Sequence, residues 1–391
     1  MLCGSHNDLG VILALKKLGF YIIVAGNKKL PADKFADKKI LADYSDMDLM
    51  LSIAKTECID AVCQCCNDFG VYTASYIAEK LHLKGYDSYE TTLLLHNKDK
   101  FKKYAKEKGL LSPISEGFTS IDDALKKINT FDLPVIVKPI DCSAGNGVSV
   151  VHYKDEFNSA LQYAFSFSKA SKIVVEPYVD GTQHGFCTYL KDKKVIAVSS
   201  NNEYSFLNPY RVEIDTYPSS TFEQSKEILI NEIEFIAKDL NLCDGIFHLQ
   251  YIFSKGKPYI IEVMRRTLGN MYSVLSNKLN NIDWDYWEAK TRVGYSVSDF
   301  PKAVKQEGFY AYKTIVAKSN GVIKKISISD NISKYVFSDF MLLKEGDFVE
   351  NYLKQPLGFL FLVFSSKDEM DKVLIRNYDL LDVNVELEEL C

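Results

Sequence analysis

The feature that most constrains this chain is the stretch of residues 133–151, in which a lysine and a loop of small residues separate two apolar runs. The first run, residues 134–137, ends at Lys138, and the second run covers residues 148–151. Two glycines lie in the loop, and glycine lets a backbone approach a ligand closely and turn its N–H groups toward it. Because a lysine beside such a loop adds positive charge, the stretch is typical of a polyphosphate site.

The composition is that of a globular protein with room for several domains. The chain has 391 residues, 47% of them hydrophobic, and a formal net charge of −5. This charge argues against a dedicated nucleic-acid or anionic-membrane surface. No apolar run approaches the roughly 20 residues of a membrane helix, and no signal-peptide pattern is visible. We therefore expect a cytoplasmic protein of two or three domains that binds neither nucleic acid nor membrane.

Nine cysteines are scattered along the chain, which is typical of reduced thiols rather than of a disulfide scaffold. Cys63, Cys65 and Cys66 lie close together, but their spacing is not that of paired C-x-x-C ligands. We interpret them as structural thiols, with a metal site as the alternative.

The first 90 residues alternate between apolar runs and helical periodicity, which predicts βαβ units on a parallel sheet. Strands are expected at residues 21–25 and 61–64, and helices at residues 46–56 and 71–81. A dinucleotide site would need three spaced glycines after the first strand, and only Gly4 and Gly10 stand there. A dinucleotide-dependent enzyme is therefore a weak alternative.

A lysine-rich helix is expected at residues 98–108, ending at Gly109. We interpret Lys102, Lys103 and Lys106 as its solvated face, whereas Lys98 differs from them by standing at the helix start.

A hairpin of two apolar strands is expected at residues 246–253 and 258–263. Side chains two apart on a strand share a face. One face would carry His248, Gln250 and Ile252, and a face of the partner strand would carry Ile260, Glu262 and Met264. Polar side chains in apolar strands are expected to bind something, because burying them unpaired is costly. The alternative is an internal network of glutamine, arginine and glutamate that only stabilises the hairpin and binds no ligand.

Other segments are expected as follows. The chain should form a helix at 122–128, a helix at 156–168, a hairpin at 183–200, an aromatic loop at 202–221, a helix at 221–240, strands at 310–317, 321–328, 341–344 and 359–364, and a helical piece at 367–377.

In this order the segments resemble the ATP-grasp superfamily, and within it the carbamoyl-phosphate-synthase-like proteins, which include carboxylate–amine ligases and relatives of biotin carboxylase. The resemblance is carried by VIVKPIDCSAGNGVSVV at 135–151, VVEPYVDG at 174–181 and FHLQYIFSKGKPYIIEVMRRTLG at 247–269. It implies an α/β chain with an α+β grasp fold. The implied parts are a parallel α/β pre-ATP-grasp domain at 1–92, a two-subdomain ATP-grasp domain at 93–304 with its ATP lid at about 112–181, and a small β-rich C-terminal domain at 305–391.

The resemblance also implies roles for individual residues. Lys98 and Lys138 would contact the nucleotide phosphates, and Arg266 would act with Lys138 in catalysis by steadying the transferring phosphate. The other implied nucleotide contacts are the phosphate loop of Ser143, Gly145, Asn146 and Gly147, the adenine connector of Glu176, Tyr178 and Val179, and Gln183 at the ribose, where a carboxylate is usual.

The implied metal, Mg²⁺ or Mn²⁺, would be held by Gln250 and Glu262. Met264 stands where an asparagine normally completes the site, and a thioether is a poor ligand for a cation that prefers hard oxygen donors. Glu262 would then be the sole protein carboxylate, which puts a second metal in question.

The implied activity is that of an ADP-forming ligase, in which ATP phosphorylates a carboxylate and an amine or related nucleophile attacks the acyl phosphate. The implied partners are small-molecule carboxylate and amine substrates, with a homodimer possible. Arg211 is a candidate for pairing a substrate carboxylate, with a surface arginine as the alternative, and Arg265 is a candidate source of extra positive charge. Two other functions stay open: a nucleotide-binding protein with weakened or lost catalysis, and a carboxylase-like enzyme that activates bicarbonate.

Overall fold

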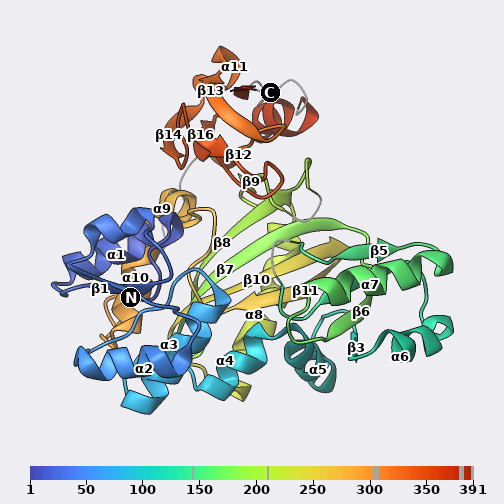
Figure 1. Cartoon of the computed structure of the whole chain (residues 1–391), viewed down its shortest axis with the longest axis horizontal. Helices are drawn as coiled ribbons and strands as arrows, with labels where there is room; N and C mark the ends of the chain where they lie inside the picture. Colours follow the sequence, from blue (N-terminus) through green and yellow to red (C-terminus); the bar gives the residue numbers. More distant parts are fainter. Residues whose placement is uncertain (143–144, 209–210, 303–307, 378–382, 389–391) are drawn as a thin grey trace.

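The computed structural model describes residues 1–142, 145–208, 211–302, 308–377 and 383–388. Figure 1 shows an N-terminal helical lobe, a long twisted sheet at the centre, a smaller lobe that carries α6 and α7, and a C-terminal layer on top. Among the described residues, no helix is long and apolar enough to cross a membrane.

The N-terminal lobe surrounds a short pair of strands. β1 (Ile23–Gly26) runs parallel to β2 (Lys38–Leu41), in agreement with the predicted parallel arrangement. The strand expected at residues 61–64 does not form a ladder; Leu2 N donates to Cys63 O there, which is too little pairing for a strand. The helices of the lobe are α1 (Leu9–Lys17), α2 (Met47–Thr56), α3 (Asp68–Leu81) and α4 (Tyr89–His96), with 3-10 turns at His6–Asp8 and Pro31–Phe35.

The cysteine cluster packs inside this lobe. Cys63 and Cys65 are buried and Cys66 is half-buried. Burial raises the pKa of Cys63 and of Cys66 to about 12, so both are neutral thiols at physiological pH.

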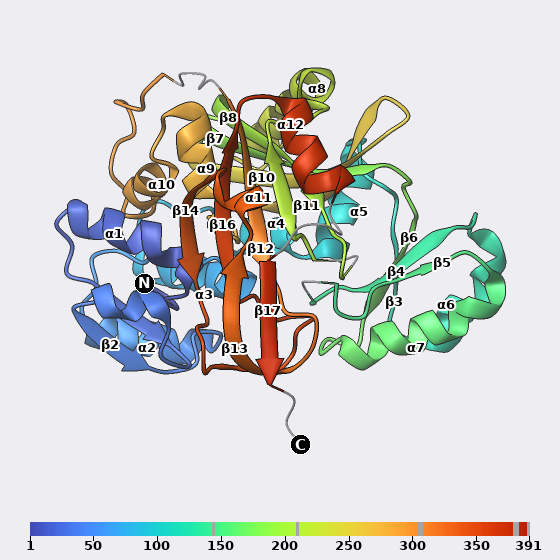
Figure 2. The same cartoon turned by 90° about the horizontal axis from the view of Figure 1, so that it is seen from above.

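The smaller lobe is a four-stranded antiparallel sheet in the order β3-β6-β4-β5. Its helix α7 packs against β4 and β5, and their apolar side chains form a separate core. Figure 2 shows this lobe beside the β10–β11 edge of the central sheet. The elements are β3 (Glu116–Phe118), α6 (Ile121–Lys126), β4 (Val135–Pro139), β5 (Ser149–Val151), α7 (Phe157–Phe167) and β6 (Ile173–Pro177), with 3-10 turns at Ile128–Thr130 and Lys154–Glu156.

The central sheet has the strand order β11-β10-β7-β8-β9-β12-β16-β14. α5 (Lys98–Lys108) and α8 (Phe222–Asp239) cover one face, and α9 (Ser273–Asn280) and α10 (Trp284–Arg292) cover the other. The strands are β7 (Thr182–Lys191), β8 (Lys194–Tyr204), β9 (Ile214–Tyr217), β10 (Gly245–Ser254), β11 (Lys257–Met264), β12 (Phe309–Ile315), β14 (Val336–Met341) and β16 (Gly358–Phe364).

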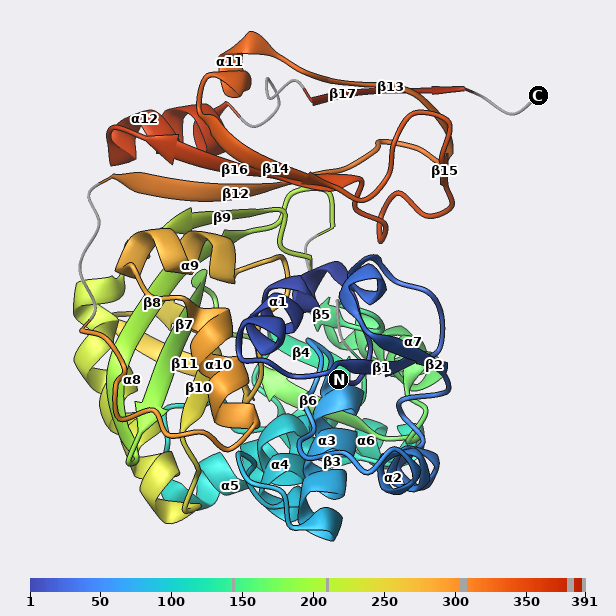
Figure 3. The same cartoon turned by 90° about the vertical axis from the view of Figure 1, so that its left-hand side faces the viewer.

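The C-terminal layer continues this sheet, because β12 pairs with β9 (Figure 3). A separate three-stranded sheet has the order β15-β13-β17. The prediction of a strand at residues 341–344 is wrong in position, because β14 ends at Met341. The remaining elements are β13 (Gly321–Ile328), α11 (Asp330–Ser333), β15 (Phe348–Val349), α12 (Lys367–Asp371), a π-helical turn (Lys372–Arg376) and β17 (Val383–Glu388). The domain boundaries stay a prediction.

Candidate active site

A cavity of about 510 Å³ lies between the smaller lobe and the central sheet. Its lining brings together eight of the predicted residues, which come from segments up to 168 positions apart: Lys98, Lys138, Gly145, Gln183, Arg211, Gln250, Glu262 and Arg266. The sequence motifs therefore meet in one place, with cationic and carboxylate groups on facing walls.

Lys98 spans the two walls of this cleft. The side chain of Asn97 caps α5 by accepting from Lys100 N, so the helix begins at Lys98. Lys98 Nζ donates to Cys142 O at 2.8 Å and lies 3.4 Å from Glu262 Oε1. Burial lowers the pKa of Lys98, but the carboxylates of Glu262 and Asp68 outweigh it and raise the pKa above its ordinary value. The ammonium group is therefore charged and available to a phosphate.

Lys138 is held by a buried carboxylate. Its Nζ lies 2.8 Å from Glu176 Oε2, and Lys102 Nζ approaches the same oxygen at 3.7 Å. Glu176 Oε1 is buried and has no hydrogen-bond partner among the residues that the structure describes. The two lysines lower the pKa of Glu176 although burial alone would raise it. Glu176 thus orients Lys138.

The prediction that Lys102 lies on a solvated face is wrong. The residue is 2% exposed, and its ammonium donates to Ser112 Oγ at 2.9 Å and to Ile260 O at 3.2 Å. Burial lowers its pKa to about 8. A signal was present in the sequence, because a spacing of four puts Lys98 and Lys102 on one side of the helix. Lys103, in contrast, is exposed as predicted.

The adenine connector does not line this cavity. Glu176 points to the two lysines, and Tyr178 N already donates to Pro134 O at 3.0 Å. The Tyr178 N–H group is therefore not free for adenine in this arrangement, and the predicted roles of Tyr178 and Val179 stay predictions.

The phosphate loop is described only from Gly145 onward, and Ser143 lies outside the described residues. Gly145 lines the cavity, whereas Asn146 is half-buried beside it. Gly147 has a φ of +74°, and a Cβ there would lie 2.6 Å from Pro139 Cγ. Glycine at position 147 is therefore required by both backbone conformation and space.

The hairpin places Gln250 directly across from Glu262, and His248 across from Met264. The register then shifts by one residue, so that Tyr251 lies across from Ile260. This bulge puts Ile261 in the cleft and Ile260 in the core, which corrects the prediction that Ile260 shares a face with Glu262.

The side chains of Glu262 and Gln250 fit Mg²⁺ only if other ligands complete its coordination shell. Glu262 offers one carboxylate, while Gln250 Nε2 donates to Glu203 at 2.9 Å and leaves its carbonyl oxygen for a cation. In the part of the chain that the structure describes, no three His, Cys, Asp or Glu side chains are grouped to hold a metal. Nucleotide phosphates and water would supply the remaining ligands, as is common for Mg²⁺.

Arg266 is oriented by the N-terminal lobe. Its Nε donates to Asp68 Oδ1 at 2.9 Å, and Nη1 donates to Thr267 O at 3.1 Å. His96 Nε2 accepts from the backbone of Arg265, so its Nδ1 carries the proton and donates to Asp68 at 3.1 Å. Burial raises the pKa of Asp68, but Arg266 and His96 together outweigh it and lower the pKa overall. Asp68 and His96 hold Arg266 in place at the cleft, and sequence reasoning did not identify them.

Residues 97–299 match the family model described as carbamoyl-phosphate synthase L chain, ATP binding domain. The chain belongs to this family. The carbamoyl phosphate synthase large chain of Clostridium acetobutylicum is 23% identical over 263 residues, which are 65% of this chain and 24% of that protein. The chain thus matches about a quarter of the length of that relative.

Solved structures show the same fold. An L-amino acid ligase from Bacillus licheniformis has a TM-score of 0.82 at 18% identity, with 99% of this chain and 98% of that chain covered. The biotin carboxylase domain dimer of 2-oxoglutarate carboxylase from Hydrogenobacter thermophilus, in complex with MgADP and bicarbonate, has a TM-score of 0.77 at 16% identity, with 98% and 90% covered. The predicted α+β ATP-grasp fold and the resemblance to carbamoyl-phosphate-synthase-like proteins are confirmed.

Within this ATP-grasp fold, Arg265 is a structural residue. It is 2% exposed, its Nε pairs with Asp87 Oδ2 at 2.8 Å, and Nη1 donates to Ile246 O at 2.6 Å. Nη2 donates to Cys243 O at 2.7 Å. The side chain does not line the cleft, which corrects the prediction that Arg265 adds positive charge to the substrate site.

Arg211 and Gln183 do line the ATP-grasp cleft. Arg211 Nη1 donates to Leu353 O at 3.1 Å, so the C-terminal layer holds it at the cleft edge. Gln183 Nε2 donates to Glu203 Oε2 at 2.7 Å, the same carboxylate that Gln250 contacts. Sequence reasoning also missed the contacts of Glu203, because its partners Gln183 and Gln250 lie on two other strands.

Proposed function

We propose that the protein is an ATP-dependent carboxylate–amine ligase that forms ADP through an acyl phosphate. The observation that carries the proposal is the convergence of Lys98, Lys138 and Arg266 on one cavity, opposite the carboxylate of Glu262. Phosphoryl transfer requires positioning and charge neutralisation more than covalent help, and these groups supply both.

In the proposed reaction, Lys98 and Lys138 bind the nucleotide phosphates from the two walls of the cleft. Mg²⁺, held through Glu262 and the Gln250 carbonyl, would neutralise further phosphate charge when bound. Arg266 stabilises the charge that develops as the γ-phosphoryl group moves to the substrate carboxylate. The amine nitrogen then attacks the acyl carbon, a C–N bond forms, the C–O bond to phosphate breaks, and phosphate leaves.

One alternative is a nucleotide-binding protein with weakened catalysis. Met264 favours it, because this residue lies on the same strand as Glu262 and offers the metal a thioether instead of a hard oxygen ligand. Another is a bicarbonate-activating enzyme, which the likeness in fold to the H. thermophilus domain favours. We further propose a cytoplasmic location, where ATP and reduced thiols coexist, and a homodimer, because the H. thermophilus domain is a dimer.

The test is ADP release by the intact chain with ATP, Mg²⁺ and a panel of small carboxylates, each paired with a panel of amines. We expect ADP release that requires both a carboxylate and an amine. Tight ATP binding without ADP release under any pair would contradict a ligase and support the binding protein. Release with bicarbonate alone would support the carboxylase-like alternative.

A further inference from the structure

A second cavity, of about 240 Å³, adjoins the nucleotide cleft and shares Gln250, Met264 and Arg266 with it. Pockets for drug-sized ligands are larger, about 300–1,000 Å³, so this one suits a small molecule. Because Arg266 lines both cavities, a molecule in the second cavity lies next to the position of the transferring phosphate.

Two carboxylates face each other in this cavity. Glu203 of β8 lies directly across from Asp215 of β9 in the antiparallel ladder, so the two side chains share a face. Like charges in directly opposed positions destabilise a sheet. Such a pair is expected where something else holds it together.

Among the described residues, Asp215 has no cationic partner. It is 5% exposed, and its Oδ1 is buried without a hydrogen bond. No cation among the described residues pairs with Glu203 or Asp215. Glu203 contacts the amides of Gln183, Gln250 and Asn201, and Asn201 also contacts Asp215, but these neutral groups do not compensate the charge. Burial, and then the charge of Glu203, raise the pKa of Asp215 well above its ordinary value. A carboxylate that lines a cavity and has no compensating cation indicates a cationic ligand.

We infer that this second cavity binds the amine substrate as a cation, with its ammonium group held between Glu203 and Asp215. The inference rests on the proposed ligase function and adds the class and place of the nucleophile. The carboxylate substrate does not fit there, because both acidic groups would repel it. A metal fits less well, because the described residues provide no grouped set of three ligands and because apolar walls such as Val212 and Leu268 suit carbon.

The acidic pair also serves the chemistry. An ammonium group must lose a proton before its nitrogen can attack, and the carboxylate of Asp215, which lines the same cavity, is a suitable acceptor. The free amine then attacks the acyl carbon, the C–O bond to phosphate breaks, and the second proton of the nitrogen passes to the leaving phosphate. No other reactant is needed.

The inference is tested with Asp215→Asn and Glu203→Gln, which keep shape and remove charge. The matched control is Glu232→Gln, a carboxylate on α8 whose pKa is also raised by burial and which lines neither cavity. Each protein is assayed for ADP release with cationic amines and with hydroxylamine, which is mainly uncharged at pH 8. We expect KM for cationic amines to rise at least tenfold in the two variants. Hydroxylamine turnover should stay within about threefold of wild type in Asp215→Asn, whereas Glu203→Gln also changes the contact to Gln250.

Binding is measured separately from turnover by thermal melts with n-butylamine, n-butanol and KCl. We expect n-butylammonium, and neither n-butanol nor KCl, to raise the Tm of the wild type and of Glu232→Gln but not of Asp215→Asn. An unchanged KM for amines in both variants, or an equal Tm response of Asp215→Asn, would overturn the inference. Absence of ADP release with every carboxylate and hydroxylamine would instead overturn the ligase function. The thermal melts would still show whether the second cavity binds an amine.

Discussion

Arg266 Nε donates to Asp68 Oδ1 across 2.9 Å, and this bond joins the end of the metal-facing hairpin to the N-terminus of α3. The arginine that would stabilise the transferring phosphate is thus positioned by a lobe that itself contributes little to the nucleotide cleft. Under the proposed function, the N-terminal lobe therefore positions a residue of the reaction.

We expect Asp68→Ala to lower kcat by about 10- to 100-fold, since a hydrogen bond to a charged group contributes about 1.5–3 kcal/mol. ATP affinity should stay within about twofold, because Lys98 and Lys138 are untouched. Asp68→Asn still offers an acceptor oxygen and should recover part of the activity. Asp60→Asn, an exposed carboxylate in the same lobe, is the control. Equal kcat in Asp68→Ala and wild type would show that Arg266 needs no positioning.

Lys138→Ala should weaken ATP binding at least tenfold, measured by titration calorimetry, while circular dichroism stays native. It also leaves Glu176 with one cation, at 3.7 Å, so stability should fall by at most about 3–5 kcal/mol. Adding Glu176→Gln should restore stability but not ATP binding. Lys103→Ala on the exposed face of α5 is the matched control. Unchanged ATP affinity in folded Lys138→Ala would mean that the phosphate site is misassigned.

Met264→Asn should lower the Mg²⁺ concentration that gives half-maximal ADP release, by about three- to tenfold. The substitution returns a hard oxygen donor to the wall opposite His248, beside Glu262. Met264→Leu keeps an apolar side chain of similar size and should leave the Mg²⁺ dependence unchanged. An unaltered Mg²⁺ profile in Met264→Asn would place the metal elsewhere.

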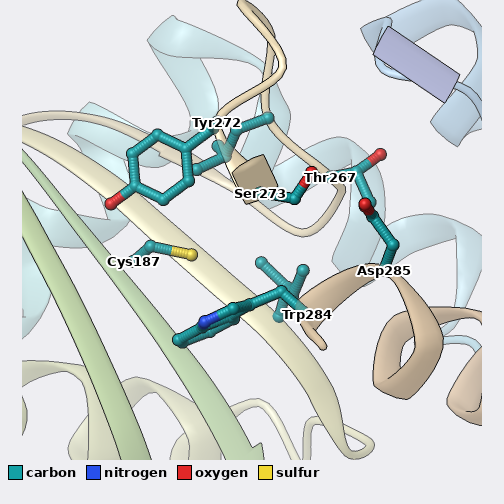
Figure 4. A pocket seen from close by; sticks show the side chains of 8 residues that line it. Cys187, Thr267, Tyr272, Ser273, Trp284 and Asp285 are labelled. Atoms are coloured by element: carbon teal, nitrogen blue, oxygen red, sulfur yellow. The ribbon is translucent and has the colours of Figure 1, made fainter. Parts of the chain in front are cut away.

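Asp285 should make stability pH-dependent. Figure 4 shows its side chain extending from α10 toward Thr267 in a small pocket, and a Cβ at Gly10 would lie 1.9 Å from its Oδ2. Burial raises its pKa to about 7 from an ordinary value of 3.8. Because the folded pKa is the higher one, the stabilising contribution of the protonated form is full below pH 3.8 and is lost as pH rises to about 7.

Asp285→Asn should therefore raise the free energy of unfolding at pH 8 by roughly 2–4 kcal/mol and flatten its pH dependence between about pH 4 and 7. Urea unfolding at several pH values measures both effects. Asp132→Asn, on the surface, should change neither. A variant less stable than wild type at pH 8 would contradict the burial argument.

Local signals made part of the fold predictable. The helix Lys98–Lys108 follows from a capping asparagine and a terminal glycine, and Gly109 adopts the left-handed conformation at a φ of +71°. The alternation of the hairpin predicted that Gln250 shares a face with His248 and that Glu262 shares a face with Met264, and the structure places Gln250 across from Glu262. The phosphate-binding motif correctly named Lys138 and Gly145 as cleft residues. Each of these features depends on neighbours within a few residues or on one hairpin turn.

By itself, then, the sequence determined the ATP-grasp family, the order of the elements and the lysines and arginine of the cleft. Only the tertiary structure decided that Lys102 is buried, that Arg265 turns inward and that Asp68 holds Arg266. The pairing of Glu203 with Asp215 was likewise decided there. The reason is physical: burial and charge pairing depend on which distant segments pack together, and a one-residue bulge at Ile261 is enough to change which side chain faces the cleft.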